Sequence, residues 1–521
     1  MGEADSLQAE VLDFLGRPQA YVLPVATVER IETHASVVFL AGSFAYKVKR
    51  AVKYNFLDFS TLEKRQVACL NELRVNLRTA PQLYLEVLPV IEDDGKFHLG
   101  GDGEAIEWVL KMRRFDQAAL YDDMAAEGRL SLAGMPRLAE IIAAFHESAD
   151  RVLSAEQAVR PLKGVLSDNA ETFAAHPAIF PSQAARALDG ASRDRLAALA
   201  PLLATRARGG YVRHCHGDLH LRNIVEIDGA PVLFDAIEFD DRLATIDVLY
   251  DLAFLLMDLG KRGLNSHANA VLNAYLDAEG STGNLLGLAA LPLFLSMRAA
   301  VRAKVELLRA NLAAPDRAES AREEVHAYFA LAQSFLAPAG PSLIAIGGLS
   351  GSGKSAVSRA IAPHIGAFPG AVHVRSDVER KRLFGVAPLE RLPADAYTLE
   401  VTKRVYAMCR KRALLTLEGG QSVIVDAVHA RPEEREALAA LAADNGVPFT
   451  GLWLDAPASI LRDRIAARTG DASDATPELV DVQLGYEIGP QNFTPIDASG
   501  PVDRVAASCL ERIGVEPRAP L

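Results

Sequence analysis

The sequence predicts two domains of different class: an α+β domain of two lobes, then an α/β domain with a doubly wound parallel sheet. Short β-like runs dominate the expected small lobe, about residues 20–112, and long Ala- and Leu-rich helical patterns dominate the expected helical lobe, about 115–336. A seam rich in Pro and Gly, Leu336–Ser342, then separates a helical run from an apolar strand. We therefore expect one domain over residues 1–336 and a second over 341–521.

The composition is typical of a globular protein with more than one core. The chain has 521 residues, of which 50% are hydrophobic, and this excludes a disordered or fibrous protein. Its net charge of −12 disfavours a surface that wraps duplex nucleic acid, because phosphates require a basic field. The 4 cysteines lie far apart and form no C-x-x-C pair, so we expect reduced thiols without a disulfide framework or a structural zinc site.

Neither a signal peptide nor a membrane span is expected. The N-terminus begins with acidic residues and lacks the apolar core of a signal peptide. The most lipid-like stretch, Leu285–Met297, is interrupted by Pro292 and is shorter than the roughly 20 residues that a span requires. We expect a buried helix there, no membrane partner and a cytoplasmic protein.

The first elements expected are two strands followed by a capped helix. Residues alternate in the short runs Ser36–Leu40 and Phe44–Val48. Ser60 and Glu63 form an S-x-x-E pattern, which predicts a capping box at the start of the helix. A small sheet lobe with one helix, followed by a larger helical lobe, is a layout typical of kinases.

The helical lobe carries the first set of chemical groups. His216, Asp218 and Asn223 fit the pattern H-x-D-x-x-x-x-N, and a short strand, Pro231–Phe234, delivers Asp235. Phosphoryl transfer from ATP needs a carboxylate that takes the proton of the acceptor hydroxyl, and oxygen ligands that hold Mg²⁺. We expect Asp218 to be the catalytic base, Asn223 and Asp235 to be metal ligands, and His216 to be structural.

These motifs resemble the aminoglycoside phosphotransferase and choline kinase group of the eukaryotic-like kinase superfamily, over about residues 20–335. The resemblance implies a bilobal kinase fold that binds ATP. Ala45-Tyr46-Lys47 matches the A-x-K of the third strand, which implies that Lys47 contacts the α and β phosphates. Lys49 lies on the same face of that strand and is the competing choice. The resemblance also implies that Glu72 is the ion-pair partner of the lysine, and that Asp251 braces the catalytic loop.

One feature of that group is missing from the sequence. No G-x-G-x-x-G phosphate loop precedes Lys47, and Thr33-His34-Ala35-Ser36 connects the first two strands instead. Backbone amides near Ser36 would then have to cover the phosphates. This departure resembles the small-molecule kinases more than the protein kinases, so we expect a small-molecule hydroxyl acceptor.

A P-loop opens the second half of the chain. The sequence GGLSGSGKS fits G-x-x-x-x-G-K-S, with the apolar strand Leu343–Ile346 before it and a helical pattern after it. Glycines let backbone N–H groups turn toward phosphate, the lysine adds a point charge, and the final serine ligates Mg²⁺. The expected nucleotide-binding residues of this loop are Gly348, Ser350, Gly351, Ser352, Gly353, Lys354 and Ser355, with Ser355 also a metal ligand.

Two further strands are expected to deliver carboxylates to the mouth of the P-loop. Strand Ala371–Val374 precedes Asp377 and Arg380, and strand Ser422–Val425 precedes Asp426. The carboxyl ends of parallel strands face the ligand crevice. We expect Asp377 to be the catalytic carboxylate, Arg380 to hold a negative group of the acceptor, and Asp426 to bind Mg²⁺ or its water from a Walker B-like position.

Basic residues of the second half have open roles. Arg464 and Arg468 are expected at i and i+4 on one helical face, either as lid arginines that bind the nucleotide phosphates or as a solvated face. Arg431 and Arg435 are either acceptor contacts or ordinary surface charges.

Residues 341–521 resemble the P-loop kinases that include polynucleotide 5′-hydroxyl kinase, zeta toxin and gluconate kinase. The whole chain resembles bacterial proteins that fuse the two domain types, which implies an ATP- and Mg²⁺-dependent bifunctional phosphotransferase with small-molecule hydroxyl acceptors.

One alternative is that the P-loop half acts on a nucleic-acid 5′-hydroxyl or a nucleotide sugar. Another is that one half only senses nucleotide and regulates the other. An aminoglycoside acceptor would need an acidic cleft, for which the candidates are Glu238, Asp240, Asp241 and Asp247.

Overall fold

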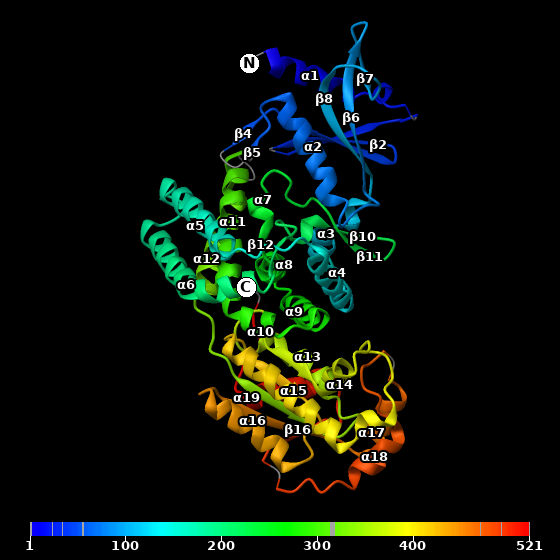
Figure 1. Cartoon of the computed structure of the whole chain (residues 1–521), viewed down its shortest axis with the longest axis vertical. Coiled ribbons are helices and arrows are strands. Elements are labelled where there is room, and N and C mark those ends of the chain that lie inside the picture. The colour runs from blue at the N-terminus through cyan, green and yellow to red at the C-terminus, as the bar shows by residue number, and fades with distance from the viewer. Residues whose placement is uncertain are drawn as a thin grey trace. The chain divides into compact units, whose positions relative to one another are not determined.

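The computed structural model contains two compact units, shown in Figure 1. It describes residues 3–22, 24–33, 35–54, 57–312, 318–468, 470–490 and 492–519, so His34 of the expected connection between the first strands lies outside the described residues. The first unit consists of Met1–Ser131, Ala144–Leu153 and Gly210–Asp251, and the second of Leu132–Ala143, Ser154–Gly209 and Leu252–Leu521.

A six-stranded antiparallel sheet with the order β1-β2-β3-β8-β6-β7 forms the core of the first unit. Its strands are β1 (Val28–Glu32), β2 (Ser36–Ala41), β3 (Phe44–Lys49), β6 (Tyr84–Asp93), β7 (Lys96–Leu99) and β8 (Ala105–Arg113). The two strands expected from the sequence are β2 and β3, each one residue longer than expected. In the register of the sheet, Lys47 lies opposite Val38 on β2 and Leu110 on β8.

Helices α1 (Glu3–Leu15) and α2 (Leu62–Asn76) accompany this sheet. Val11 and Leu15 of α1 pack with buried strand residues such as Phe39 and Val48. The expected capping box at Ser60 is wrong: the N-cap is Thr61, whose Oγ1 accepts a hydrogen bond from Lys64 N–H at 3.3 Å. Asp58 accepts hydrogen bonds from both the hydroxyl and the amide of Ser60, so the helix begins one residue later than expected.

Short strands and short helices complete the first unit. They are β4 (Lys53–Tyr54), β5 (Leu57–Asp58), α3 (Tyr121–Ala126), β9 (Val212–His214), β10 (Ile224–Ile227), β11 (Ala230–Leu233), α7 (Asp241–Ala244) and β12 (Thr245–Asp247). Strands β10 and β11 form an antiparallel hairpin, and Val225 and Val232 from it join a buried cluster with Leu110 and Tyr84 of the large sheet. This packing fixes the hairpin, whose open end carries both Asn223 and Asp235.

Helices, most of them long as the sequence predicts, make up most of the remaining kinase-like half. They are α4 (Met135–Ser148), α5 (Ala155–Ala175), α6 (Ser182–Arg208), α8 (Val248–Lys261), α9 (Asn265–Glu279), α10 (Thr282–Gly287), α11 (Leu291–Leu312) and α12 (Ala318–Phe335). The segment Thr282–Asn311 is long and apolar enough to cross a membrane, yet 78% of its most apolar window is buried inside the protein. It is therefore a core helix, and Pro292 is tolerated because it lies in the first turn of α11.

The second unit contains a five-stranded parallel sheet with the order β14-β15-β13-β16-β17. Its strands are β13 (Leu343–Gly347), β14 (Val372–Arg375), β15 (Val423–Asp426), β16 (Phe449–Asp455) and β17 (Thr494–Asp497). Its helices are α13 (Lys354–Ile361), α14 (Ser376–Leu383), α15 (Leu399–Glu418), α16 (Pro432–Asp444), α17 (Ala458–Ala466), α18 (Pro477–Leu484) and α19 (Val502–Ile513). The predicted α/β class is confirmed.

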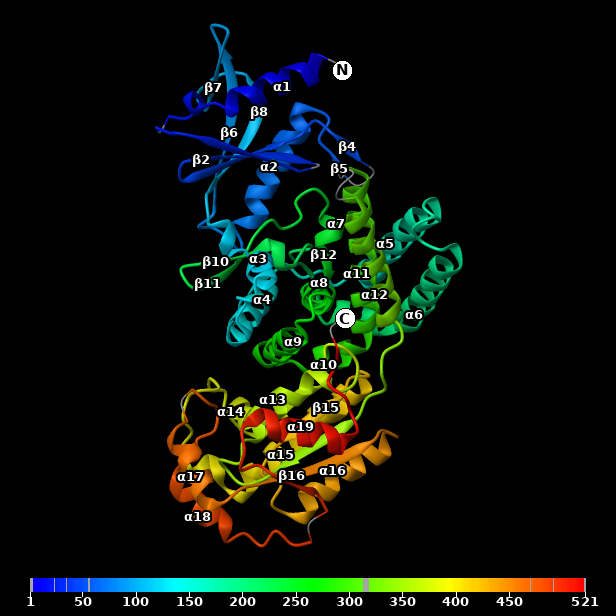
Figure 2. The same ribbon diagram turned by 180° about the vertical axis from the view of Figure 1, so that it is seen from behind.

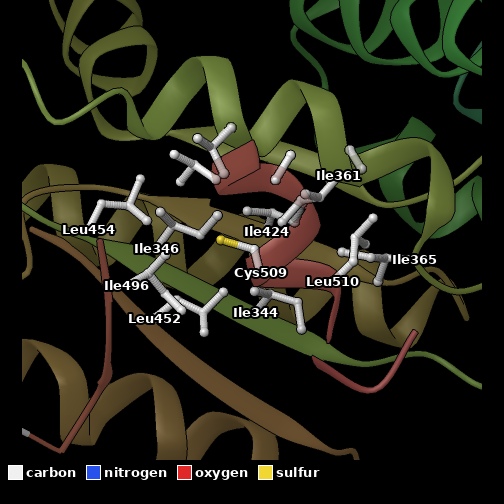
Figure 3. Close-up of a cluster of buried hydrophobic side chains, with 14 of the residues drawn as sticks. Ile344, Ile346, Ile361, Ile365, Ile424, Leu452, Leu454, Ile496, Cys509 and Leu510 are labelled. Carbon is white, nitrogen blue, oxygen red and sulfur yellow. The ribbon is translucent and has the colours of Figure 1, made fainter. Parts of the chain in front are cut away.

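Helices cover both faces of this sheet. Figure 1 views the sheet from the side of α15 and α16, and Figure 2 from the side of α19. Figure 3 shows the core between the strands and α13 and α19, where Ile344, Ile424 and Leu452 of the sheet meet Ile361 and Cys509 of the helices. Cys509 is one of four cysteines that are all free and buried, so no disulfide forms among them.

Candidate active sites

Asp251, in the first turn of α8, holds the loop that carries Asp218. Its side chain is fully buried. Oδ1 accepts the amide of Gly217 at 2.8 Å, while Oδ2 accepts the amide of His216 at 3.1 Å and lies 3.1 Å from Nε2 of His146. His216 is buried and its Nε2 lies 3.0 Å from the carbonyl of Phe234. These bonds fix the backbone immediately before Asp218.

Asp218 and Asn223 lie together at the end of this loop. The side-chain amide of Asn223 donates to the backbone carbonyl and to Oδ2 of Asp218, both at 2.9 Å. Asp218 remains 38% exposed, so its carboxylate is oriented by the chain and still accessible to an acceptor. Because both of these bonds are donated by Nδ2, the amide oxygen of Asn223 is the atom suited to a cation.

Asp235 follows β11 with a left-handed backbone, φ 59°. This conformation is uncommon for a residue other than glycine and is held here by two bonds. Its N–H donates to the hydroxyl of Tyr84 at 3.1 Å, and the next amide, that of Ala236, donates to Oδ1 of Asn76 at 2.9 Å. The side chain is 41% exposed, and its Oδ1 lies 2.7 Å from Nζ of Lys47.

Lys47 and Lys49 share the buried carboxylate of Glu72. Nζ of Lys47 lies 2.7 Å from Oε1 of Glu72, while Lys49 forms ion pairs with Oε2 of Glu72 and with Glu238. Although burial opposes it, the two ammonium groups lower the pKa of Glu72 to about 2. The structure therefore joins the expected residues Lys47, Glu72 and Asp235, and it adds Glu238, which sequence reasoning assigned only to an acidic cleft.

We expect replacement of Lys47 and of Lys49 by methionine to have different effects, one on ATP binding and the other on stability. We expect Lys47→Met to weaken ATP binding at this site about tenfold or more, because Lys47 is the lysine that reaches Asp235. We expect Lys49→Met to lower the free energy of unfolding by about 3–5 kcal/mol, because it removes the ammonium group that pairs with the buried carboxylate of Glu238. Nucleotide titration and urea unfolding followed by Trp108 fluorescence measure the two effects. The opposite pattern would assign the phosphate contact to Lys49.

The P-loop of the second unit needs its glycines for close backbone contact. A Cβ on Gly348 would lie 2.6 Å from the carbonyl oxygen of Leu454, and one on Gly351 would collide with the carbonyl of Leu461. Lys354, the first residue of α13, donates from Nζ to the carbonyls of Gly348 at 2.8 Å and Leu349 at 3.1 Å. The ammonium group therefore lies across the loop.

Ser355 and Asp426 meet because β13 and β15 are paired, with Ile346 opposite Asp426. Oγ of Ser355 donates to Oδ2 of Asp426 at 2.5 Å. Burial would raise the pKa of Asp426, but the hydrogen bond from His373 and nearby cations hold it well below its usual range. A hydroxyl and an ionised carboxylate at this spacing fit a magnesium ion. Sequence reasoning missed His373, whose Nε2 lies 3.2 Å from Oδ2 of Asp426.

Asp377 is the second residue of α14, which begins directly after β14, so it lies at the start of a helix as expected. Burial and the charge of Asp426 raise its pKa, while Arg375, Lys354 and a hydrogen bond with Ser473 oppose this. A partly buried carboxylate with a raised pKa, such as that of Asp377, is suited to proton transfer. Sequence reasoning missed Arg375, whose Nη2 contacts both carboxylate oxygens of Asp471 at 3.2 Å. Its position at the end of a strand, two residues before Asp377, was a usable signal.

Two arginines, Arg380 and Arg435, are engaged by the chain itself in ways that the sequence did not predict. Arg380 is buried, donates to the carbonyl of Ala396 at 2.7 Å and stacks over the ring of Tyr397. Its guanidinium group, expected to bind a negative group of the acceptor, is therefore bound to other residues of the chain. Arg435 is fully buried and donates to four backbone carbonyls, so it is neither an acceptor contact nor a surface charge.

The prediction that Arg464 and Arg468 share one helical face is wrong. Helix α17 ends at Ala466, so Arg468 lies beyond it. Nη2 of Arg464 donates to the carbonyl of Gly500 at 3.0 Å, and Nη1 of Arg468 lies 4.0 Å from Asp471. The C-cap of the helix is Ala467, whose amide donates to the carbonyls of Asp463 and Ile465, so the chain leaves the helix before Arg468.

His429, three residues after Asp426, should make the second unit sensitive to acid. It is fully buried, and burial lowers its pKa to about 4. Between pH 6.5 and 4 the unfolded chain binds a proton that the folded chain does not, so stability falls as the pH falls, by about 3 kcal/mol in total. We expect His429→Asn to remove this part of the pH dependence, since Asn tolerates the positive φ of 52°.

Urea titrations at pH 7.5 and 4.5, followed by Trp453 fluorescence in a Trp108→Phe background, measure this difference. An unchanged pH dependence in His429→Asn would contradict the assignment.

Comparisons with known proteins agree with the two domain types predicted from the sequence. Residues 56–286 match the Phosphotransferase enzyme family and residues 343–486 match an AAA domain. Uncharacterised proteins of Mycobacterium bovis and Mycobacterium tuberculosis are 31% identical over 479 residues, which cover 91% of this chain and 93% of each relative.

Solved structures resemble each half separately. The GDP complex of aminoglycoside 2′-phosphotransferase-IIIa has a TM-score of 0.37 and 17% identity, and the match covers 63% of this chain and 99% of that chain. A sugar kinase from Janibacter sp. HTCC2649 has a TM-score of 0.27 and 20% identity, with coverage of 34% and 96%.

Proposed function

Because the chain belongs to the same family as these mycobacterial proteins and is an ATP-dependent kinase, we propose that both of its halves are active phosphotransferases. Each half would transfer the γ-phosphoryl group of ATP to a hydroxyl of a small-molecule acceptor in the cytoplasm. The observation that supports the proposal is that carboxylate, lysine and hydroxyl or amide side chains expected from the sequence lie close together in each half.

In the first site, Asp218 would accept the proton of the acceptor hydroxyl while Asn223 keeps its carboxylate oriented. Lys47 would bind the α and β phosphates, held in place by Glu72. Asn223 and Asp235 would hold Mg²⁺, which when bound neutralises charge on the transferring phosphoryl group.

In the second site, the amides of the P-loop and Nζ of Lys354 would bind the β and γ phosphates. Ser355 and Asp426 would hold the metal, with their oxygens already 2.5 Å apart. Asp377 would take the acceptor proton, supported by its raised pKa. Arg464 and Arg468 stay proposed phosphate contacts, although they do not share a helical face.

A metabolite-library screen tests this proposal. Wild type, Asp218→Asn and Lys354→Met are each incubated with ATP and Mg²⁺, and phosphorylated products are identified by mass spectrometry. We expect two sets of products, one lost in each variant. An Asp218→Asn protein that keeps every product would refute the first site, and a Lys354→Met protein that keeps every product would refute the second. Addition of a short oligonucleotide to the library tests the alternative acceptor.

A further inference from the structure

The outer edge of strand β14 is covered by side chains of helix α9, and both elements lie within the second compact unit. Nδ2 of Asn269 and Nδ2 of Asn273 donate to the carbonyl of Ala371 at 3.1 and 3.2 Å. Oδ1 of Asn273 accepts the amide of His373 at 2.7 Å. Since an edge strand leaves such groups unpaired, the two asparagines take the place of a neighbouring strand.

The contact is closely packed. Asn269 is only 4% exposed, and its side-chain oxygen accepts from Nδ2 of Asn273 at 3.1 Å, so the two side chains orient each other. A Cβ on Gly370 would lie 2.9 Å from Nδ2 of Asn269. One turn beyond Asn273, the carboxylate of Asp277 pairs with Arg382 of α14 at 3.3 Å. These contacts fix the distance between α9 and β14.

The same strand position reaches the P-loop site. The backbone of His373 is bonded to Asn273, and its side chain lies 3.2 Å from Oδ2 of Asp426. That carboxylate oxygen also accepts the hydroxyl of Ser355. A single residue therefore separates Asn273 on α9 from the groups expected to hold the metal.

We propose that Asn273 is a positioning residue for the P-loop site, acting through His373 on Asp426. The proposal rests on the proposed function of the second half as a site for Mg²⁺ and ATP. It makes α9, a helix that precedes the seam at residue 340, part of the support of the nucleotide site that follows the seam. Loss of the amide oxygen of Asn273 would free the amide of His373 and loosen the orientation of Asp426.

The test compares Asn273→Ala with Asn265→Ala in the full chain. Asn265 is a matched control, since it lies on the same helix, is 5% exposed, and donates to the carbonyl of Ala519 instead of to β14. Hydrogen exchange resolved to the amide of His373 measures whether its hydrogen bond to Asn273 is kept. Titration with a non-hydrolysable ATP analogue and Mg²⁺, in a Lys47→Met background, reads the second site.

We expect Asn273→Ala to speed exchange of the His373 amide and to weaken binding of the Mg²⁺–analogue complex about tenfold. Asn273→Asp should recover little of this loss, because its second carboxylate oxygen would face the carbonyl of Ala371 and Oδ1 of Asn269 where the amide donated. Asn265→Ala should stay within about twofold of the parent protein, a difference below about 0.4 kcal/mol. Equal losses in Asn265→Ala and Asn273→Ala, or unchanged binding in Asn273→Ala despite a freed amide, would overturn the proposal. Absence of binding in the parent protein would instead overturn the proposed function of the second half.

Discussion

Asp218→Asn is expected to lower turnover at the first site by about 10²–10⁴-fold while ATP still binds. The amide keeps the size of the carboxylate and an oxygen that can accept the hydrogen bond from Asn223, but it cannot take a proton from an acceptor hydroxyl. Nucleotide affinity should change little, because the proposed phosphate contact is Lys47. Product formation from the acceptors found in the screen, together with nucleotide titration, measures the two effects.

A matched control for this variant is Glu226→Gln. Glu226 is an exposed carboxylate on β10 in the same segment of chain, and its replacement should leave turnover within about twofold. Loss of nucleotide binding in Asp218→Asn would show that the residue supports the site structurally. Turnover equal to that of wild type would remove Asp218 as the base.

Lys354→Met is expected to reduce turnover at the second site by about 10²–10³-fold or more. The methionine fills similar space but removes the charge that lies across the P-loop, where Nζ contacts the carbonyls of Gly348 and Leu349. Burial already lowers the pKa of this lysine, and Asp426 and Asp377 oppose that shift. The charge is thus held in a poorly solvated site, where its effect on phosphate is large. Turnover with second-site acceptors measures the loss.

Lys403→Met controls for the removal of a positive charge from the second unit. Lys403 is exposed on α15, so this variant should keep both activities. First-site products should also be unchanged in Lys354→Met. A parallel loss of both product sets would indicate that the two sites do not work independently.

Local sequence signals predicted the parts of each site that lie next to a strand end or within one loop. Lys354 and Ser355 came from a contiguous motif, and Asp377 and Asp426 from the apolar strands before them. Asp218 and Asn223 are five positions apart in one loop. In each case the groups are brought together by hydrogen bonding within a few residues or by pairing of adjacent parallel strands.

The contacts that were missed join segments that lie far apart in the sequence. Arg375 meets Asp471 across 96 positions, and Lys49 meets Glu238 across 189. No periodicity or spacing in the sequence marks such pairs. The misplaced cap has a local cause: Ser60 and Thr61 are both good N-cap residues, and Asp58 decided between them by binding Ser60.

The asparagine pair on α9 also has a consequence for dividing the chain. A fragment that begins at the seam near residue 340 would keep its P-loop and all five strands but would lose Asn269 and Asn273. The outer edge of β14 would then present an unsatisfied carbonyl and amide to solvent, and such an edge can pair with the same edge of another molecule. A fragment that begins at this seam is therefore expected to self-associate, and a stable second unit requires α9 as well.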